Sequence, residues 1–364
     1  MIVKADCKFF RGDIPCLPHK ERGIHCDQCE FYAPVSRKIL IIKLGAIGDV
    51  IRTTPLLSGL RKRYPNALVY WLTHSVDVLP TSVDVKMEFS LASVLTLEET
   101  HFSLAINLDK DREACALLNR VRADVKKGFA LKDGKPAPID QDATHKFYTG
   151  IFDDVSKANR KSYPEEIFEI AGLTFSGEPY ELENSEAGKI AWRLDRNKPI
   201  VGLNTGCGER WLSRLWPDEH WKETIKILLA RDYEVVLLGG KSEHEKNLAF
   251  SAETGAKYFG HFPLKTFIDL IDQCDIVVTQ VTMAMHLAIG RRKRLVLMNN
   301  IFNKHEFELY GLGEIVEPSS GCECYYLSNC KREARGEARC MRDILPIDVL
   351  NAVQRQTFHF EKVK

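Results

Sequence analysis

The chain has 364 residues, of which 45% are hydrophobic, and its formal net charge is +1. That length is sufficient for two domains with separate cores. The near-neutral charge excludes a global attraction to nucleic acid, and the absence of any run of about 18 apolar residues excludes a predicted membrane-spanning helix. The start, MIVKADCKFF, lacks the apolar core of a signal peptide, so we expect a cytoplasmic protein.

Eleven cysteines are many for this length, and eight of them lie towards the two ends. In a reducing compartment, clustered thiols indicate metal ligands more than disulfides. Residues 1–36 are polar and turn-rich, which predicts an extension without a hydrophobic core, and they carry Cys7, Cys16, Cys26 and Cys29. A tetrahedral zinc site, or second an iron–sulfur cluster, would stabilise this extension; free or disulfide-bonded thiols are the remaining alternative.

The stretch KILIIKLGAIGDVIRTTPLL, residues 38–57, predicts a buried strand, a tight turn and a helix. The turn places Asp49 in the first turn of the helix, where the helix dipole favours the ionised carboxylate. The carboxyl end of a parallel strand is where α/β proteins bind ligands, so Asp49 could act as a general base. Simple helix capping is the competing interpretation.

Taken whole, KLGAIGDVIRTTPLL resembles the N-terminal signature of glycosyltransferase family 9, the heptosyltransferases of lipopolysaccharide core synthesis. In that family the Asp of the Gly-Asp pair is the proposed catalytic base, and the resemblance assigns this role to Asp49. We expect Arg52, one turn later, to bind an anionic acceptor together with Lys43. A solvated helix face is the alternative for the arginines of this segment.

Strands and helices then alternate as far as about residue 180, which predicts a doubly wound domain. The predicted strands are 39–42, 68–72 and 104–109, and the predicted helices are 50–64, 112–121 and 165–171. The charged stretch 181–199 lacks strand character and predicts a linker. We therefore divide the chain into the extension 1–36, an acceptor domain 37–185, a nucleotide-sugar domain 195–342 and a closing helix within 343–364.

The second domain opens with a predicted strand, 200–204, that runs into Thr205 and Gly206. The backbone N–H groups of this small-residue loop could approach a phosphate, and a plain turn is equally compatible. The following SRLWPDEHW resembles the second signature of the family, in which a basic residue before Trp-Pro contacts the diphosphate of the nucleotide sugar. The resemblance assigns that contact to Arg214.

Residues 269–290, DLIDQCDIVVTQVTMAMHLAIG, resemble the third signature, T-N-D-S-G-x-M-H-L-A. Thr282 and His286 fit this pattern as donor-binding residues, with core packing as the alternative for His286. Val281 and Met283 depart from it, because the family has there an Asp that binds the donor and a Gly that admits the phosphate. We expect Gln280 to take over a sugar or ribose hydroxyl and the donor pocket to differ.

A second cysteine cluster, Cys322, Cys324, Cys330 and Cys340, lies in the tail segment GCECYYLSNCKREARGEARCMRDI. It predicts a second metal site, or thiols shared with the first set. The cations of residues 290–294, GRRKR, predict a solvated loop or a contact with anionic lipid or a phosphorylated acceptor.

The predicted fold class is α/β with GT-B architecture: two Rossmann-like domains facing a cleft, with an N-terminal Cys-rich extension. The resemblance implies inverting transfer of heptose from ADP-heptose to an inner-core lipopolysaccharide sugar. In that reaction Asp49 takes the acceptor proton, and Arg214 stabilises the departing diphosphate. The transfer then needs no metal cofactor, and the cysteine clusters hold structural zinc or iron–sulfur.

Two other functions stay open. One is a protein heptosyltransferase of the autotransporter type, or transfer from another nucleotide sugar; a product on lipid A core or on serine would discriminate. The other is a non-catalytic metal-binding interaction module, in which Val281 marks a dead donor site. The expected partners are the nucleotide sugar and the lipopolysaccharide core, without nucleic acid, and peripheral contact with the inner membrane is part of the expected location.

Overall fold

The computed structural model of the protein describes residues 2–208 and 210–361. Residue 1 of the predicted extension and residues 362–364 of the predicted closing segment lie outside the described residues. The rest forms two compact units. The first consists of Met1–Gly45, Pro55–Phe147 and Ile167–Glu178, and the second of Ala46–Thr54, Tyr148–Glu166 and Pro179–Lys364.

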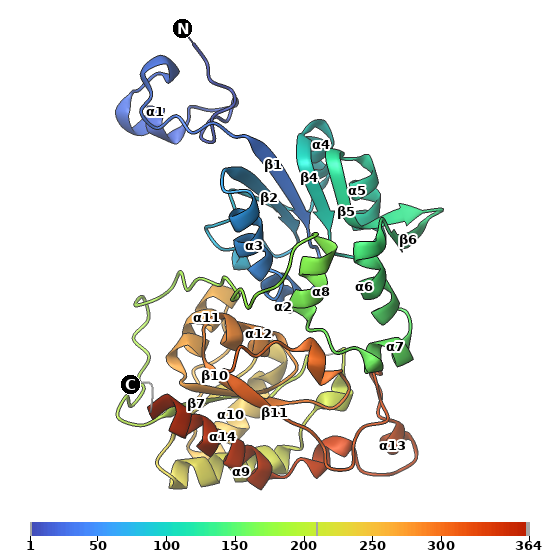
Figure 1. Ribbon diagram of the computed structural model, residues 1–364. Helices are drawn as coiled ribbons and strands as arrows, with labels where there is room; N and C mark the ends of the chain where they lie inside the picture. The colour runs from blue at the N-terminus through green and yellow to red at the C-terminus, as the bar shows by residue number, and fades with distance from the viewer. Residues whose placement is uncertain (1, 209, 362–364) are drawn as a thin grey trace. The chain divides into compact units, whose positions relative to one another are not determined.

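The first unit is built on a mostly parallel sheet, which within the described residues has six strands in the order β3-β2-β1-β4-β5-β6 (Figure 1). The strands are β1 (Arg37–Ile42), β2 (Ala67–Thr73), β3 (Val85–Glu88), β4 (His101–Asn107), β5 (Arg122–Lys132) and β6 (Lys135–Pro138). Only β6 runs antiparallel to its neighbour. The strand order reverses between β1 and β4, which makes the carboxyl ends of these two strands a natural ligand crevice.

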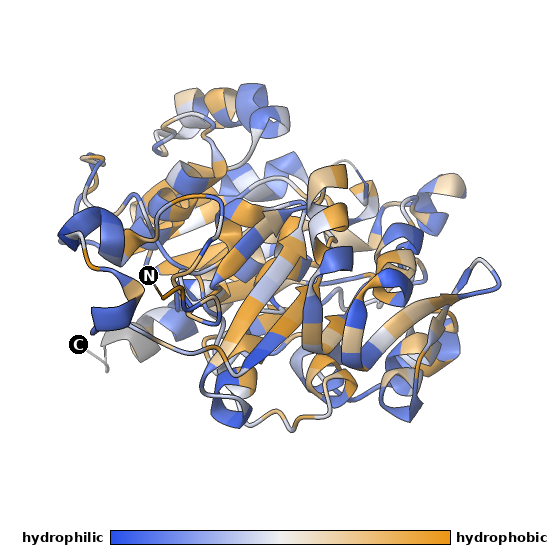
Figure 2. Ribbon diagram, turned by 90° about the horizontal axis from the view of Figure 1, so that it is seen from above, coloured by the Kyte–Doolittle hydropathy of each residue, from blue (hydrophilic) through white to orange (hydrophobic). Residues whose placement is uncertain are grey.

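The second unit has a fully parallel sheet, with five described strands in the order β11-β10-β9-β7-β8. The strands are β7 (Ile200–Asn204), β8 (Glu234–Leu238), β9 (Ile276–Gln280), β10 (Arg294–Met298) and β11 (Gly313–Val316). Every residue of β7, β8 and β9 is buried, as expected for strands covered on both faces. This burial explains why most residues of these three strands are apolar. Figure 2, coloured by hydropathy, shows orange segments along strands of the fold.

Helices and short 3₁₀ segments connect the strands. The α-helices are α1 (Leu17–Arg22), α2 (Ile47–Ile51), α3 (Pro55–Arg63), α4 (Leu91–Glu99), α5 (Arg112–Arg120), α6 (Thr144–Thr149), α7 (Asp153–Ala158), α8 (Tyr163–Ile170), α9 (Asp218–Ala230), α10 (His244–Thr254), α11 (Leu264–Gln273), α12 (Met283–Gly290), α13 (Lys331–Ala334) and α14 (Pro346–Glu361). The 3₁₀ segments are η1 (Cys26–Gln28), η2 (Val76–Val78), η3 (Gln141–Ala143), η4 (Leu212–Arg214), η5 (Lys241–Glu243), η6 (Lys304–Glu306) and η7 (Cys340–Asp343).

The core of the second unit is centred on two tryptophans near the start of α9. Trp216 and Trp221 are fully buried, and their rings meet edge to face with centroids 4.8 Å apart. The indole of Trp216 donates a hydrogen bond to the carbonyl of Ile344 at 2.8 Å. Val349 and Val353 of α14 belong to the same core, so the predicted closing helix packs on the second sheet.

The predicted helix 50–64 is wrong, because two helices, α2 and α3, occupy this stretch. Pro55 opens α3, and a proline disfavours helical backbone at the residue before it. The hydroxyl of Thr54 donates to the carbonyl of Ile51 and caps the end of α2. The break matters because α2 is counted with the second unit and α3 with the first.

Candidate functional site

A pocket of about 840 Å³ lies in the second unit, at the carboxyl ends of β7, β8, β9 and β10. All of its lining residues belong to that unit. They come from α2 and its start (46–49 and 52), the stretch after β7 (204, 206–208, 210, 211 and 214), the loop after β8 (239, 240, 242 and 243), the region of α11 (262, 264 and 267), the start of α12 (281–284 and 286), and residues 302, 306, 307 and 326. Open α/β sheets bind ligands at this edge.

Asp49 lines this pocket as a member of an ion pair. Its Oδ1 lies 2.7 Å from Nη2 of Arg52, and the two side chains are 35% and 18% exposed. The guanidinium also lies over the ring of Tyr163, 3.6 Å from the ring centre. Burial works against the charge of Arg52, but Asp49 is close enough to hold the pKa of the guanidinium above its ordinary value. Arg52 therefore fixes the carboxylate at the pocket wall.

α2 packs tightly against α12 where Gly48 meets His286. A Cβ on Gly48 would lie only 2.6 Å from Cδ2 of His286, so this position requires glycine. Burial, and then the charge of Arg52, lower the pKa of His286 to about 3 against the opposing effect of Asp49, so the imidazole is neutral near pH 7. Its ring stacks on Tyr180 with centroids 6.2 Å apart.

Arg214 brings a buried positive charge to the same pocket. Only 7% of the residue is exposed, and its guanidinium donates to the carbonyls of Cys207 and, at 3.3 Å, Trp211. Burial lowers the pKa of Arg214 to about 10, which leaves it charged at neutral pH. In the part of the chain that the structure describes, no carboxylate forms a salt bridge with it. A desolvated cation bonded only to carbonyls still favours an anion.

The loop after β7 is held from below by side chains of the sheet. The amide of Asn204 donates to the carbonyl of Gly206 and the hydroxyl of Thr279, both at 3.0 Å. With its amide nitrogen turned towards the loop, Gln280 donates to the same Gly206 carbonyl at 2.9 Å. Thr205 is buried and donates to Asn247 at 2.6 Å. Gly206 therefore lines the pocket, whereas Thr205 and Gln280 support the loop behind it.

The start of α12 forms an apolar part of the wall. Thr282 is the N-cap, and its hydroxyl accepts a hydrogen bond from the backbone N–H of Ala284 at 3.2 Å. Val281 and Met283 line the pocket on either side of it. The two departures from the third signature thus lie in the pocket wall, together with Thr282 and His286.

Lys43, the other residue expected to bind an acceptor, belongs to the first unit and forms a buried ion pair with Asp109. The two side chains are 6% and 7% exposed. Asp109 also accepts hydrogen bonds from the backbone N–H groups of Leu44 and, at 3.0 Å, Gly45. This cluster fixes the turn after β1. Asp109 follows β4, because this strand ends at Asn107, two residues before the end of the predicted strand 104–109.

The sequence reasoning missed Glu306 and Tyr326, which line the pocket together. The hydroxyl of Tyr326 donates to Oε1 of Glu306 at 2.6 Å, and Glu306 is only 9% exposed. Glu306 follows β10, so a strand prediction there, combined with the rule for parallel sheets, could have found it. Tyr326 lies between two cysteines of the tail and carried no local signal.

The C-terminal thiols lie close to one another. The N–H of Cys324 donates to Sγ of Cys322 at 3.3 Å, and the N–H of Lys331 donates to Sγ of Cys324 at 3.1 Å. Cys324 and Cys330 pack together with Ile301. Across the described residues, however, no group of three or more His, Cys, Asp or Glu side chains is arranged to hold a metal ion.

The basic stretch 290–294 uses two of its cations inside the second unit. Arg291 and Lys293 lie 2.9 and 3.3 Å from carboxylate oxygens of Asp272. None of the helices in the described part of the chain combines the length and the apolar character needed to cross a bilayer.

Known proteins resemble this chain in sequence and in fold. The family model described as glycosyltransferase family 9 (heptosyltransferase) matches residues 96–298, more than half of the chain. Lipopolysaccharide heptosyltransferase 2 of Escherichia coli K12 is 23% identical over 291 residues, which cover 72% of this chain and 82% of that protein. The match to this relative therefore includes most of both proteins.

Two solved structures extend the likeness to the fold. A glycosyl transferase family 9 protein of Veillonella parvula superposes with a TM-score of 0.66 at 16% identity, covering 89% of this chain and 98% of its own. The E. coli ADP-heptose LPS heptosyltransferase II superposes with a TM-score of 0.65 at 18% identity, covering 89% of this chain and 99% of its own. These structures confirm the predicted GT-B class with its two Rossmann-like sheets. The chain belongs to glycosyltransferase family 9, the heptosyltransferase family, and is a glycosyltransferase.

Proposed function

We propose that the protein transfers heptose from ADP-heptose to a hydroxyl of an inner-core lipopolysaccharide sugar, with inversion at the anomeric carbon. One observation carries this proposal: a carboxylate, Asp49, and a buried cation, Arg214, line the same pocket, and no described carboxylate forms a salt bridge with Arg214. Glycosyl transfer from a nucleotide sugar needs a base for the acceptor and a positive charge for the leaving diphosphate.

In the proposed reaction Asp49 accepts the proton of the acceptor hydroxyl as its oxygen attacks the anomeric carbon. The bond to the diphosphate breaks on the opposite face, and negative charge develops on the departing oxygen. Arg214 stabilises that charge together with backbone N–H groups of the loop after β7 and of the start of α12. Arg52 orients the carboxylate, because its guanidinium is 2.7 Å from Oδ1 of Asp49.

The donor is proposed from the relatives, whose printed names include ADP-heptose and lipopolysaccharide heptosyltransferase. Val281 and Met283 give the donor pocket an apolar surface where the family signature has Asp and Gly. We therefore expect the donor of this protein to be held there by van der Waals contact and not by a carboxylate. An acceptor linked to lipid would bring the protein to the cytoplasmic face of the inner membrane.

The proposal includes a structural metal, zinc or iron, at Cys322, Cys324, Cys330 and Cys340. Backbone N–H groups already donate to two of these sulfurs, at 3.3 and 3.1 Å, and such bonds stabilise thiolate ligands. A bound metal would supply folding free energy to a loop that buries little apolar surface. The transfer itself uses side-chain and backbone charges in this proposal, and the metal takes no part in it.

Calorimetric titration with ADP-heptose and with ADP tests the donor site. We expect roughly micromolar binding by the wild type. Arg214→Met should weaken it about 10- to 100-fold, the effect of losing a charge-assisted hydrogen bond, and Asp49→Asn should leave it unchanged. Lys226→Met removes an exposed cation of α9 and serves as the matched control. Absence of binding by every nucleotide sugar tried would refute the enzyme proposal in favour of the interaction module.

Product analysis then identifies the acceptor. Wild type incubated with ADP-heptose and a heptose-deficient lipopolysaccharide core should yield the extended core, and Asp49→Asn should not. Heptose found on serine of a polypeptide in place of the core would favour the protein acceptor. Cosedimentation with vesicles of anionic lipid checks the expected membrane contact.

A further inference from the structure

The N-terminal extension, residues 2–36, has a defined backbone but almost no buried side chains. Pro18 is the single buried residue among them. Phe9 and Phe10, which could have formed a small core, are 36% and 39% exposed. Apolar burial on this scale does not offset the conformational entropy of ordering about 35 residues. Something other than a hydrophobic core must hold the extension together.

Backbone hydrogen bonds show which parts of the extension lie side by side. The N–H of Lys8 donates to the carbonyl of Ala33, and the N–H of Val35 donates to the carbonyl of Asp6, both at 2.8 Å. These bonds place Cys7 opposite the segment that leads directly into β1. The beginning and the end of the extension therefore meet next to the first sheet.

The other cysteines are placed by two short helices. Cys16 is the N-cap of α1, and Cys26 and Cys29 bracket the turn of η1. Gly23 ends α1 with a φ of 69°, which turns the chain back from Cys16 towards Cys26. Positions far apart in the sequence are thus folded back towards one another.

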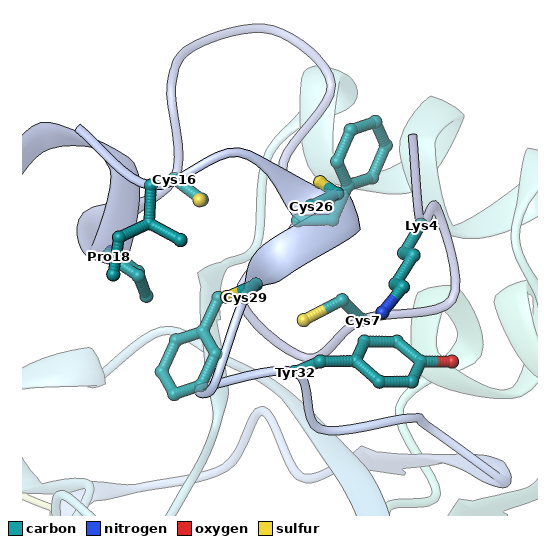
Figure 3. A pocket seen from close by; sticks show the side chains of 10 residues that line it. Lys4, Cys7, Cys16, Pro18, Cys26, Cys29 and Tyr32 are labelled. Carbon is teal, nitrogen blue, oxygen red and sulfur yellow. The ribbon is translucent and has the colours of Figure 1, made fainter. Parts of the chain in front are cut away.

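All four thiols line one small pocket, of about 20 Å³ (Figure 3). The rest of its lining is aliphatic, aromatic or proline, except for Lys4. None of the four cysteines is in a disulfide. A space of this size holds one water-sized occupant. Four cysteine sulfurs around so small a space are typical of a metal-binding site, and the space is too small for a substrate.

We propose that Cys7, Cys16, Cys26 and Cys29 bind one structural Zn²⁺. Four thiolates form the tetrahedral shell that zinc prefers in closed sites, and each thiol releases its proton when it binds the metal. The described side chains are not yet gathered as a metal group. A cysteine has a single side-chain torsion with three staggered positions, and the inference requires rotation of side chains that already line one pocket.

The surroundings also match the charge of such a site. A zinc ion with four thiolates carries a net negative charge, and Lys4 is the cation of the pocket lining. Its Nζ lies 4.1 Å from the centre of the Tyr32 ring, whose hydroxyl in turn donates to Asp6 at 2.6 Å. Lys4 is therefore held next to the thiols, where a positive charge stabilises the thiolate form.

The bound metal would fasten the start of the extension, its middle and the residues before β1 at one point. Lys8 adds a link to the sheet itself, because its Nζ is 2.5 Å from Asp84, and Asp84 accepts from the N–H of Val69 in β2. The site is structural in this inference. It is also independent of the proposed transfer, since none of its residues lines the pocket of the second unit.

Metal analysis of the purified full chain tests the inference. The C-terminal cysteines are first removed as ligands by Cys330→Ser/Cys340→Ser, so that any remaining metal reports on the extension. This background should retain one equivalent of zinc, and adding Cys26→Ser/Cys29→Ser should remove it. His25 is exposed, directly precedes Cys26 and does not line the pocket, so His25→Asn is the matched control and should retain the metal.

Two measurements keep the test decisive if a variant folds poorly. Replacement of zinc by Co²⁺ in the C-terminal background should give the absorption of a tetrahedral tetrathiolate, and chelation should make residues 1–36 sensitive to protease. Two disulfides in protein purified without reductant would overturn the inference. So would iron with acid-labile sulfide, or four freely titratable thiols without metal.

Discussion

Each unit places a cation and a carboxylate near strand carboxyl ends, but the surroundings of these charges differ. In the first unit Lys43 and Asp109 are 6% and 7% exposed, and two backbone N–H groups add to the carboxylate's partners. In the second unit Asp49 is 35% exposed in its pair with Arg52, and Arg214 donates hydrogen bonds to the carbonyls of Cys207 and Trp211. The charges of the first set are almost fully buried against one another, whereas those of the second set line a pocket.

Under the proposed function, this difference separates a charge cluster that stabilises the fold from one that binds substrate. A buried ion pair with extra hydrogen bonds is strongly destabilising to break, because the remaining charge stays desolvated. A buried cation that the fold does not neutralise costs stability, and binding of an anion recovers that cost. Two groups of cations and carboxylates can therefore be assigned different roles from their surroundings.

Replacement of the carboxylate that lines the pocket, Asp49, should give the largest effect. Asp49→Asn keeps the shape of the side chain but cannot accept the acceptor proton, so the transfer rate should fall about 10²- to 10⁴-fold. Donor affinity should hardly change, because Asp49 is not proposed to contact the diphosphate. Steady-state kinetics with separate donor titrations check both statements. A variant that retains a tenth of the wild-type rate would show that Asp49 is not the base.

Breaking the buried ion pair between Lys43 and Asp109 should instead lower the stability of the fold. Lys43→Met leaves Asp109 buried without its cation and should lower the free energy of unfolding by about 3–5 kcal/mol. Nucleotide affinity should stay near that of the wild type. Denaturant unfolding of Lys43→Met beside Arg214→Met checks the contrast. Equal destabilisation by both variants would mean that the two cations have the same role.

The ion pair of Asp49 and Arg52 lies near His286, and the lowered pKa of this histidine predicts that stability depends on pH. The pKa of His286 is about 3 when folded and near 6.5 when unfolded, so below pH 6.5 the unfolded chain binds a proton that the folded protein does not. Stability should be complete above pH 6.5 and fall towards pH 3, by at most about 4–5 kcal/mol from this residue. His286→Gln should show a shallower slope in acid unfolding, and parallel curves would contradict the assignment.

The smallest effect on the transfer rate is expected when Arg52 is replaced by another cation of different shape. Arg52→Lys retains a cation near Asp49 but not the planar group over Tyr163, so the rate should fall only about 3- to 30-fold. Arg52→Met removes the charge as well and should lower the rate further. If the lysine variant is as slow as the methionine variant, the stacking, and not the charge, positions Asp49.

Most strands and the family could be predicted from the sequence because their signals are local. Apolar runs predicted β1, β2, β4 and β7, and three signatures predicted Asp49, Arg214 and His286 as candidate site residues. Other features depend on tertiary contacts that no single segment encodes. Lys43 is held in an ion pair by Asp109, which is more than sixty residues away in the sequence. Gln280 supports the loop after β7 because its amide donates to the carbonyl of Gly206.

The contact between Gly48 and His286 has a consequence for building chimeras within the family. A crossover at the linker 181–199 would inherit α2 from one parent and α12 from the other, although both belong to the second unit. With 2.6 Å between His286 and a Cβ at position 48, even an alanine from one parent would collide with the histidine of the other. Exchanging residues 46–54 together with the second half should preserve this fit and make hybrid enzymes far easier to recover.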